Sequence, residues 1–161
     1  MEILPFGNLD SNNVENYYSG SVHVNKNEIE IDLNFEEEQV DENILISVKE
    51  TISKIYEFSN KAWSAISDDW DLDGDSETAR FYLQHHLDEF SDEEIKKIFG
   101  TSKIDKQSFI NSLTLTRIGL YPESEDMFII FDIQFSPDLT NYLMSVAFDG
   151  DGEFVEISME S

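Results

Sequence analysis

The spacing of the apolar side chains changes twice along this chain of 161 residues, and that change limits the folds it can adopt. Residues 22–35 alternate between apolar and polar side chains, as in a strand with one buried face. Between Asp41 and Trp70, apolar side chains recur at every third or fourth position, which is typical of an amphipathic helix. Residues 113–159 return to alternation. The chain therefore predicts two strands, then helices, then four more strands.

Short turns separate the predicted strands. Asn25-Lys26-Asn27 stands between two alternating runs and tolerates the positive φ of a tight turn, so residues 22–35 predict a β-hairpin. The later strands are expected at 113–121, 127–135, 142–148 and 155–159. Because only a few residues connect these four strands, they predict an antiparallel meander.

The middle of the chain predicts helices at 41–67, 77–90 and 91–100, and a short helical turn near 105–111. Asp41 can cap the first helix, and no Gly or Pro interrupts it. Ser91-Asp92-Glu93-Glu94 reads as a capping box that opens the third helix, and Gly100 is its expected end.

Helices inserted between two blocks of strands predict an α+β domain. We expect an antiparallel sheet of about six strands, in the order ββ-helices-ββββ, with the helices packed on one face. No repeat or linker interrupts the chain, so residues 1–161 are expected to form a single domain. The first twenty residues are rich in turns, and their apolar side chains are expected to pack onto this domain.

The charge is strongly negative. The chain has 35 Asp and Glu residues against 10 Lys and Arg, a formal net charge of −25. About 2–8 units of net charge suffice for solubility, and the excess destabilises the folded state by self-repulsion. The charge therefore predicts a basic partner, although a solvated acidic surface without a target is the simpler alternative. Nucleic acid and anionic membranes repel such a surface and are not expected as partners.

No residue set here indicates a reaction. The chain has no Cys, no G-x-S-x-G motif, no Gly-rich phosphate loop and no H-E-x-x-H helix, so we expect no enzyme activity and no cofactor. His85 and His86 would point apart on a helix and cannot share one metal ion, so one is expected in the core and the other towards solvent. The absence of Cys and of a visible signal peptide favours a cytoplasmic location.

Residues 69–80 match only the first half of a calcium-binding loop. Asp69, Asp71 and Asp73 occupy the first, third and fifth positions, but the twelfth, which should be Glu, is Arg80. We therefore expect no metal site and interpret the segment as an acidic turn between helices, with a looser cation site as the alternative. The run 149–153 is likewise interpreted as a hairpin turn.

The same segment is the strongest candidate for a binding surface. Residues 68–77 hold six acids and no base, together with Trp70. Trp is a preferred anchor at protein interfaces, but Trp70 is also in phase with the apolar stripe of the helix and could belong to the core. The expected binding residues are Asp68, Asp69, Trp70, Asp71, Asp73, Asp75 and Glu77. Acidic runs at 36–42 and 88–94 also border helix ends, and together the three would give the helical layer one negative field.

Three segments carry a resemblance to a known family: Phe6-Gly7-Asn8-Leu9-Asp10 followed by Tyr17-Tyr18, the run 29–35, and the ending 148–161. With these strand and turn patterns the chain resembles the small acidic bacterial proteins of domain-of-unknown-function family 2004. Relatives of this kind often occur beside secreted toxins, so the resemblance implies an immunity role. The family pattern designates no functional residue.

The charge and the resemblance together predict a cytoplasmic immunity protein. Such a protein would bind and neutralise a cognate, basic toxin, for example a nuclease, with carboxylates that steer association and aromatic side chains that anchor it. The alternative is a structural or cation-responsive acidic module that has no toxin partner.

Overall fold

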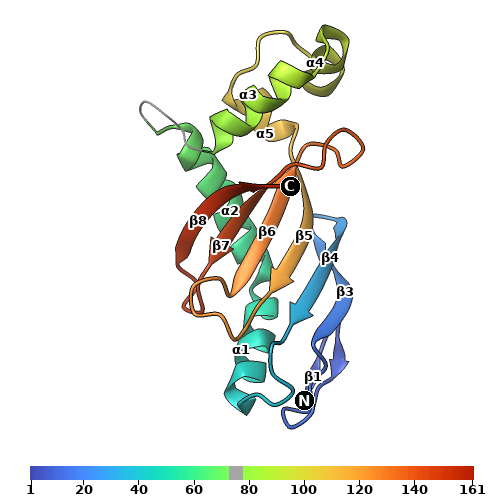
Figure 1. Ribbon diagram of the computed structural model, residues 1–161, viewed down its shortest axis with the longest axis vertical. Coiled ribbons are helices and arrows are strands. Elements are labelled where there is room, and N and C mark those ends of the chain that lie inside the picture. Colours follow the sequence, from blue (N-terminus) through green and yellow to red (C-terminus); the bar gives the residue numbers. More distant parts are fainter. Residues whose placement is uncertain (73–77) are drawn as a thin grey trace.

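The computed structural model describes residues 1–72 and 78–161, and it has the α+β architecture that the apolar spacing predicts (Figure 1). The strands are β1 (Glu2–Ile3), β2 (Gly7–Asn8), β3 (Tyr17–Val24), β4 (Asn27–Asn34), β5 (Thr114–Leu120), β6 (Ile129–Gln134), β7 (Leu143–Phe148) and β8 (Phe154–Glu160). The helices are α1 (Glu42–Ser53), α2 (Ile55–Trp70), α3 (Ala79–Glu89), α4 (Asp92–Phe99) and α5 (Lys106–Asn111).

Six strands form one sheet in the order β3-β4-β5-β6-β7-β8, and β1 pairs with β2 separately. The hairpin prediction for 22–35 is confirmed: Asn25 and Lys26 both have positive φ, and β3 pairs antiparallel with β4. However, β3 begins at Tyr17, five residues before the alternation that predicted it. The predicted meander is also confirmed, because β5 to β8 pair antiparallel with their neighbours.

The sheet is mixed, which corrects the prediction that it is antiparallel throughout. β4 pairs with β5 in parallel, with Ile31 beside Ile118 and Leu33 beside Leu120. These four side chains are fully buried, so the apolar alternation sets the register of this pair. Parallel strands need a long crossover, and the five helices of the described ranges lie in the connection between β4 and β5.

The first predicted helix is in fact two helices that meet at Lys54. The Lys54 N–H donates to the carbonyls of Thr51 and Ile52, which ends α1, and α2 starts at the next residue. The buried apolar positions keep the same spacing across this break, and neither Gly nor Pro marks it. The apolar pattern therefore could not reveal it.

The prediction that the helices pack on one face of the sheet is wrong for three of the described helices. α1 and α2 lie behind the sheet in Figure 1, and α2 contacts β3, β7 and β8. In contrast, α3, α4 and α5 gather beyond one end of it. The predicted capping box of α4 is confirmed, with Ser91 and Glu94 bonded reciprocally and Gly100 at a φ of 69°.

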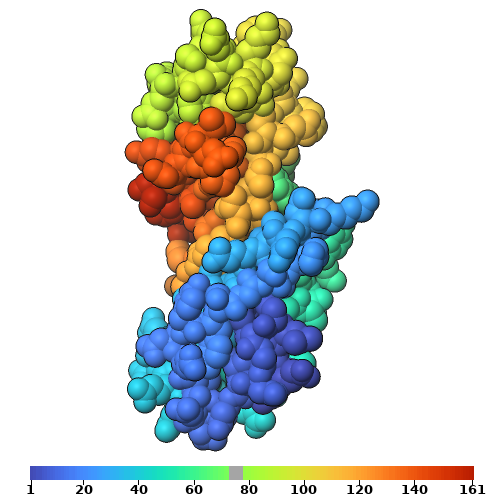
Figure 2. Space-filling view, turned by 90° about the vertical axis from the view of Figure 1, so that its right-hand side faces the viewer, coloured from blue at the N-terminus to red at the C-terminus, as the bar shows by residue number. Residues whose placement is uncertain are grey.

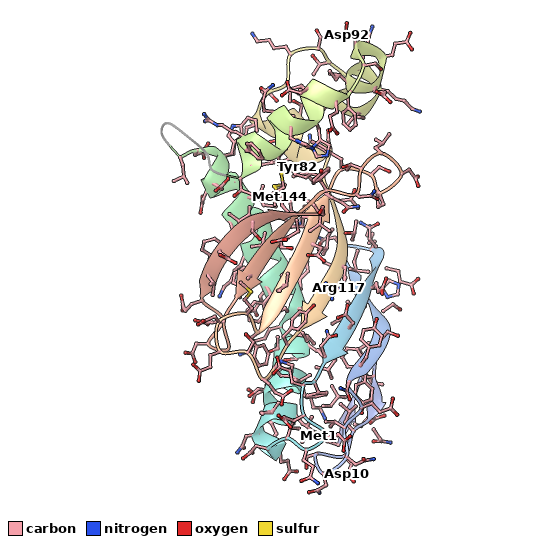
Figure 3. All side chains as sticks on the ribbon, in the orientation of Figure 1. Met1, Asp10, Tyr82, Asp92, Arg117 and Met144 are labelled. Atoms are coloured by element: carbon pink, nitrogen blue, oxygen red, sulfur yellow. The ribbon has the colours of Figure 1, made fainter. Side chains whose placement is uncertain are left out.

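One cluster of buried side chains joins the sheet to both groups of helices. Phe135, directly after β6, packs against Tyr82 and His86 of α3, Phe99 of α4 and Phe109 of α5. Figure 3 labels Tyr82 where α3 approaches the sheet. These contacts fix α3, α4 and α5 relative to the strands.

The N-terminal arm packs onto the body as predicted. Ile3 and Leu9 are buried, although Leu4 is exposed. Figure 2 shows the N-terminal segment (dark blue) against the β3–β4 hairpin (blue). A Cβ at Gly20 of β3 would lie 2.6 Å from Cγ of Pro5, so only Gly allows this approach.

No helix in the two described ranges has both the length and the apolar character needed to cross a membrane.

Candidate functional site

The structure describes four of the seven predicted binding residues. Asp68, Asp69 and Trp70 end α2, and Asp71 follows the helix. Asp73, Asp75 and Glu77 lie outside the described residues. The other two acidic runs are far from each other: residues 36–42 lead into α1 at the lower end of the molecule in Figure 1, and residues 88–94 join α3 to α4 at the upper end.

Asp69 is a structural residue. Its side chain is buried, and its Oδ2 accepts a hydrogen bond of 2.7 Å from the N–H of Ala79, the first residue of α3. A carboxylate at the start of a helix satisfies one of the free N–H groups there and interacts favourably with the helix dipole. Asp69 therefore links the end of α2 to the start of α3.

Trp70 packs against the core, which is the alternative that its place in the apolar stripe suggested. Its ring stacks on Phe109 of α5 at 4.8 Å between centroids, and the side chain is half-buried. The guanidinium of Arg80 lies over the same Trp70 ring, 5.5 Å from its centroid. Trp70 thus joins α2 to α5 and to α3.

Asp71 forms an ion pair with Lys106 of α5, while Asp68 is exposed. Two of the carboxylates that matched a calcium loop, Asp69 and Asp71, therefore already contact donors within the protein. Across residues 1–72 and 78–161, no group of three or more His, Asp and Glu side chains is arranged to hold a metal ion.

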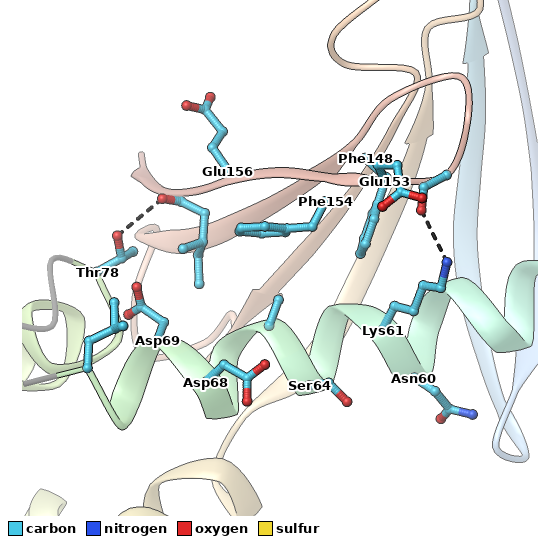
Figure 4. A pocket seen from close by; sticks show the side chains of 14 residues that line it. Asn60, Lys61, Ser64, Asp68, Asp69, Thr78, Phe148, Glu153, Phe154 and Glu156 are labelled. Atoms are coloured by element: carbon cyan, nitrogen blue, oxygen red, sulfur yellow. Dashed lines mark hydrogen bonds between the residues drawn. The ribbon is translucent and has the colours of Figure 1, made fainter.

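A groove of about 780 Å³ lies between α2 and β8, and it contains Asp68 and Asp69 (Figure 4). We call it the α2–β8 groove. Its apolar surface comes from Ala65, Leu72, Phe148, Phe154 and Ile157, and its polar and charged lining includes Asn60, Lys61, Ser64, Asp68, Asp69, Thr78, Glu153 and Glu156. Figure 4 shows Phe154 between the strand and the helix, and Glu156 on the side of β8 that faces away from α2.

Large apolar side chains remain exposed at this groove. Phe154 is 50% exposed and Leu72 is 52% exposed, whereas Phe148 beneath them is buried. The exposed carboxylates of Asp68 and Glu153 border this apolar surface, and that of Glu156 lies on the opposite side of β8. The groove thus combines an apolar floor with a negative rim.

Two hydrogen bonds mark the ends of the groove. At one end, the Lys61 ammonium donates to the Gly152 carbonyl at 3.1 Å. At the other, the Thr78 hydroxyl donates to the Ile157 carbonyl at 3.2 Å. Gly152 has a φ of 82° and lies so close to Phe58 that a Cβ would be 3.2 Å from that ring.

The turn that precedes β8 is the hairpin turn that the sequence predicts. Asp149 Oδ1 accepts hydrogen bonds of 2.9 Å from the N–H groups of both Asp151 and Glu153. The carboxylate of Asp149 is therefore used within the turn, and it positions Glu153 at the rim of the groove.

Sequence reasoning missed the groove, but the sequence does hold a signal for it. Phe148 pairs with Phe154 and Ala147 pairs with Glu156, so Val155 is an extra residue that forms a β-bulge. In the sequence this appears as two adjacent apolar residues, Phe154 and Val155, where strict alternation allows one. The bulge leaves both side chains exposed.

The second feature that sequence reasoning missed is a charged network across the middle of the sheet. Arg117 of β5 donates to both oxygens of Asp32 on β4 at 2.6 and 2.7 Å, and to Asp132 on β6 at 3.0 Å. It also donates to the hydroxyl of Tyr121. Figure 3 labels Arg117 beside the junction of β4 and β5.

This network is well satisfied and mostly buried. Asp32 is 1% exposed and Asp132 is 6% exposed. Burial alone would lower the pKa of Arg117, but its hydrogen bonds to Asp32, Tyr121 and Asp132 raise that pKa above its usual value. Arg117 is the only basic residue after Lys106, a signal that the sequence analysis did not use.

His86 and Tyr82 form a buried polar pair in α3. His86 Nδ1 donates to the Tyr82 carbonyl at 2.7 Å, since a carbonyl can only accept, and Nε2 lies 2.8 Å from the Thr140 hydroxyl. Burial lowers the pKa of His86 below its usual value, and the hydrogen bond to the Tyr82 carbonyl offsets only part of this shift. The Tyr82 hydroxyl donates to the Tyr142 carbonyl, and burial raises its pKa. The expectation that one His is in the core is confirmed, while His85 is partly exposed.

No protein-family model, no curated protein and no solved structure matches the chain. The resemblance to family 2004 therefore stays a prediction.

Replacing Asp69 with Ala is expected to lower the free energy of unfolding by about 1–3 kcal/mol, because the Ala79 N–H loses a buried acceptor. Replacing the adjacent, exposed Asp68 with Ala should change it by less than about 0.5 kcal/mol. Urea denaturation of the two variants measures this difference. Equal stabilities would contradict the structural role of Asp69.

Proposed function

We propose that the chain is an immunity-type inhibitor that binds a basic protein toxin in the α2–β8 groove. The observation that carries this proposal is the combination found at the groove: exposed Phe154 and Leu72, bordered by the carboxylates of Asp68 and Glu153, with that of Glu156 on the other side of β8. Isolated apolar residues on a surface need no explanation, but an apolar groove whose charged lining consists mainly of carboxylates suits a specific partner.

The charge of the whole chain supports a basic partner. With a net charge of −25, the protein attracts positively charged surfaces over a distance of about one Debye length, roughly 8 Å at physiological salt. Steering of this kind raises association rates to about 10⁸–10⁹ M⁻¹ s⁻¹ at low salt. The carboxylates of the rim would then pair with Lys and Arg side chains of the toxin.

Inhibition in this proposal comes from binding alone. A toxin that acts on an anionic substrate such as RNA or DNA needs a basic surface to hold it. An acidic protein that covers that surface excludes the substrate by occupying its place and by repelling it. Phe154 and Leu72 would be the apolar centre of the contact, where most binding energy is usually concentrated.

Co-expression tests the proposal. We expect the gene next to the one that encodes this chain to specify the toxin. Its product is made in a bacterial host, with and without the chain, and growth is measured. We expect the chain to restore growth and to co-purify with the toxic protein as a stable complex. Failure to restore growth, or restoration without a complex, would contradict inhibition by binding.

A further inference from the structure

β8 is the last strand of the sheet, and the α2–β8 groove runs along it. It pairs with β7, and among the described residues no further strand lies beyond it. Natural proteins commonly protect such edges with Lys or Pro, or cover them. Residues 154–160 contain neither Lys nor Pro, so what protects this edge is the bulge at Val155 and two hydrogen bonds at the ends of the groove, from Lys61 and Thr78.

We infer that the partner contributes a short extended segment, with alternating basic and apolar residues, which lies along the edge of β8 over the α2–β8 groove. This inference rests on the proposed function and specifies how the partner binds. Addition of a strand to a sheet edge is a recurrent mode of peptide recognition, in which backbone hydrogen bonds give affinity and side-chain pockets give specificity.

The length of the segment follows from the two hydrogen bonds at the ends of the groove. They involve the carbonyls of Gly152 and Ile157, which are five residues apart. At about 3.3 Å per residue, this gives roughly 16 Å of edge, enough for about five residues of an added strand. The bulge at Val155 interrupts the regular ladder of β8, which also favours a short segment over a long one.

The alternation follows from the two sides of β8. Successive side chains of an added strand point to opposite faces of the sheet. On the α2 side they would meet Phe154 and Leu72, which favours apolar residues, and on the other side they would meet Glu156 (Figure 4), which favours Lys or Arg.

The charge argues against a second copy of this chain as the occupant. Pairing of β8 with another β8 would bring Glu153, Glu156 and Glu160 of two copies into one short interface, and each copy carries a net charge of −25. Like charges on neighbouring strands destabilise a sheet. A basic segment of another protein has the opposite effect.

The inference can be tested with peptides and the full chain. The probe is a fluorescent seven-residue peptide, acetyl-Lys-Val-Arg-Val-Lys-Val-Arg-amide, and its affinity is measured by anisotropy. Two controls are a peptide with Glu at all four basic positions and one with N-methyl groups on alternate amides. We expect the basic peptide to bind, and each control to bind at least about tenfold more weakly, the equivalent of about 1.4 kcal/mol.

A matched pair of variants locates the peptide. Phe154→Ala should weaken peptide binding at least about fivefold, whereas Phe81→Ala on α3, where Phe81 is 57% exposed, should leave it unchanged. Hydrogen exchange should show the peptide protecting amides of residues 154–157. Absence of peptide binding, equal binding of the N-methylated peptide, or protection elsewhere would overturn the inference, as would a dimer of the chain formed through β8.

The two proposals can fail separately. If co-expression restores growth but the peptide does not bind or does not protect residues 154–157, the extended segment is wrong and the inhibitor function stands. If the chain forms no complex with the toxic protein, the proposed function fails, whatever the peptide does.

Discussion

Replacing Arg117 with Ala is expected to lower the free energy of unfolding by about 3–5 kcal/mol, because it leaves two buried carboxylates without their partner. Asp32 and Asp132 lie on either side of Arg117 in the sheet and are almost fully buried. The effect should be large because Asp32 belongs to β4, and the β4–β5 pair is the one parallel junction of the described sheet. Urea denaturation measures the change.

Two comparisons isolate the network from a general effect of charge. Lys49→Ala removes the same charge from an exposed position on α1 and should change the stability by less than about 0.5 kcal/mol. A triple variant, Arg117→Met with Asp32→Asn and Asp132→Asn, should recover part of the stability that Arg117→Ala loses, since no charge is then left buried. An Arg117→Ala variant as stable as Lys49→Ala would show that the network contributes nothing to stability.

Reversing the charge at the groove is expected to weaken binding of the basic partner at least about 100-fold, because close charge pairs at interfaces are individually coupled by about 1.5 kcal/mol or more. The variant combines Asp68→Lys, Glu153→Lys and Glu156→Lys, all at exposed positions. The stability of the chain should change little. The affinity of the variant for the purified toxic protein is measured by surface plasmon resonance or by isothermal titration calorimetry.

The matched control reverses three exposed carboxylates elsewhere, with Glu37→Lys, Glu38→Lys and Glu50→Lys. It changes the net charge by the same amount, but near α1. Because distant charges are screened by salt, its affinity should fall by less than about tenfold at 0.15 M ionic strength. Equal losses in the two triple variants would mean that net charge, and not the groove, determines binding.

Local patterns in the sequence were sufficient for most elements of the fold. Alternation identified the strands of the meander, Asn25 and Lys26 identified the hairpin, and Ser91 with Glu94 identified the start of α4. These signals succeed because each depends on neighbouring residues. The direction of β4 relative to β5 depends instead on where the helical crossover returns to the sheet, which no local pattern encodes.

The candidate site was predicted in part. The acidic segment at the end of α2 does border the groove, but Asp69 and Trp70 have packing roles within the protein, and Asp73, Asp75 and Glu77 lie outside the described residues. Phe154 and Glu156 come from β8, and Glu153 comes from the turn before it, more than 80 residues later in the chain. Sequence spacing cannot reveal that two such distant segments lie side by side. The Arg117 network was missed for the same reason, because its carboxylates come from two other strands.

The central claim is that the α2–β8 groove is where this acidic protein holds another macromolecule. Hydrogen–deuterium exchange of the chain, alone and in complex with the toxic protein, tests it most directly. We predict slower exchange in residues 60–68 and 152–157 in the complex, and unchanged exchange in α4. Protection confined to α4, or to the β3–β4 hairpin, with no change along α2 and β8 would contradict the claim.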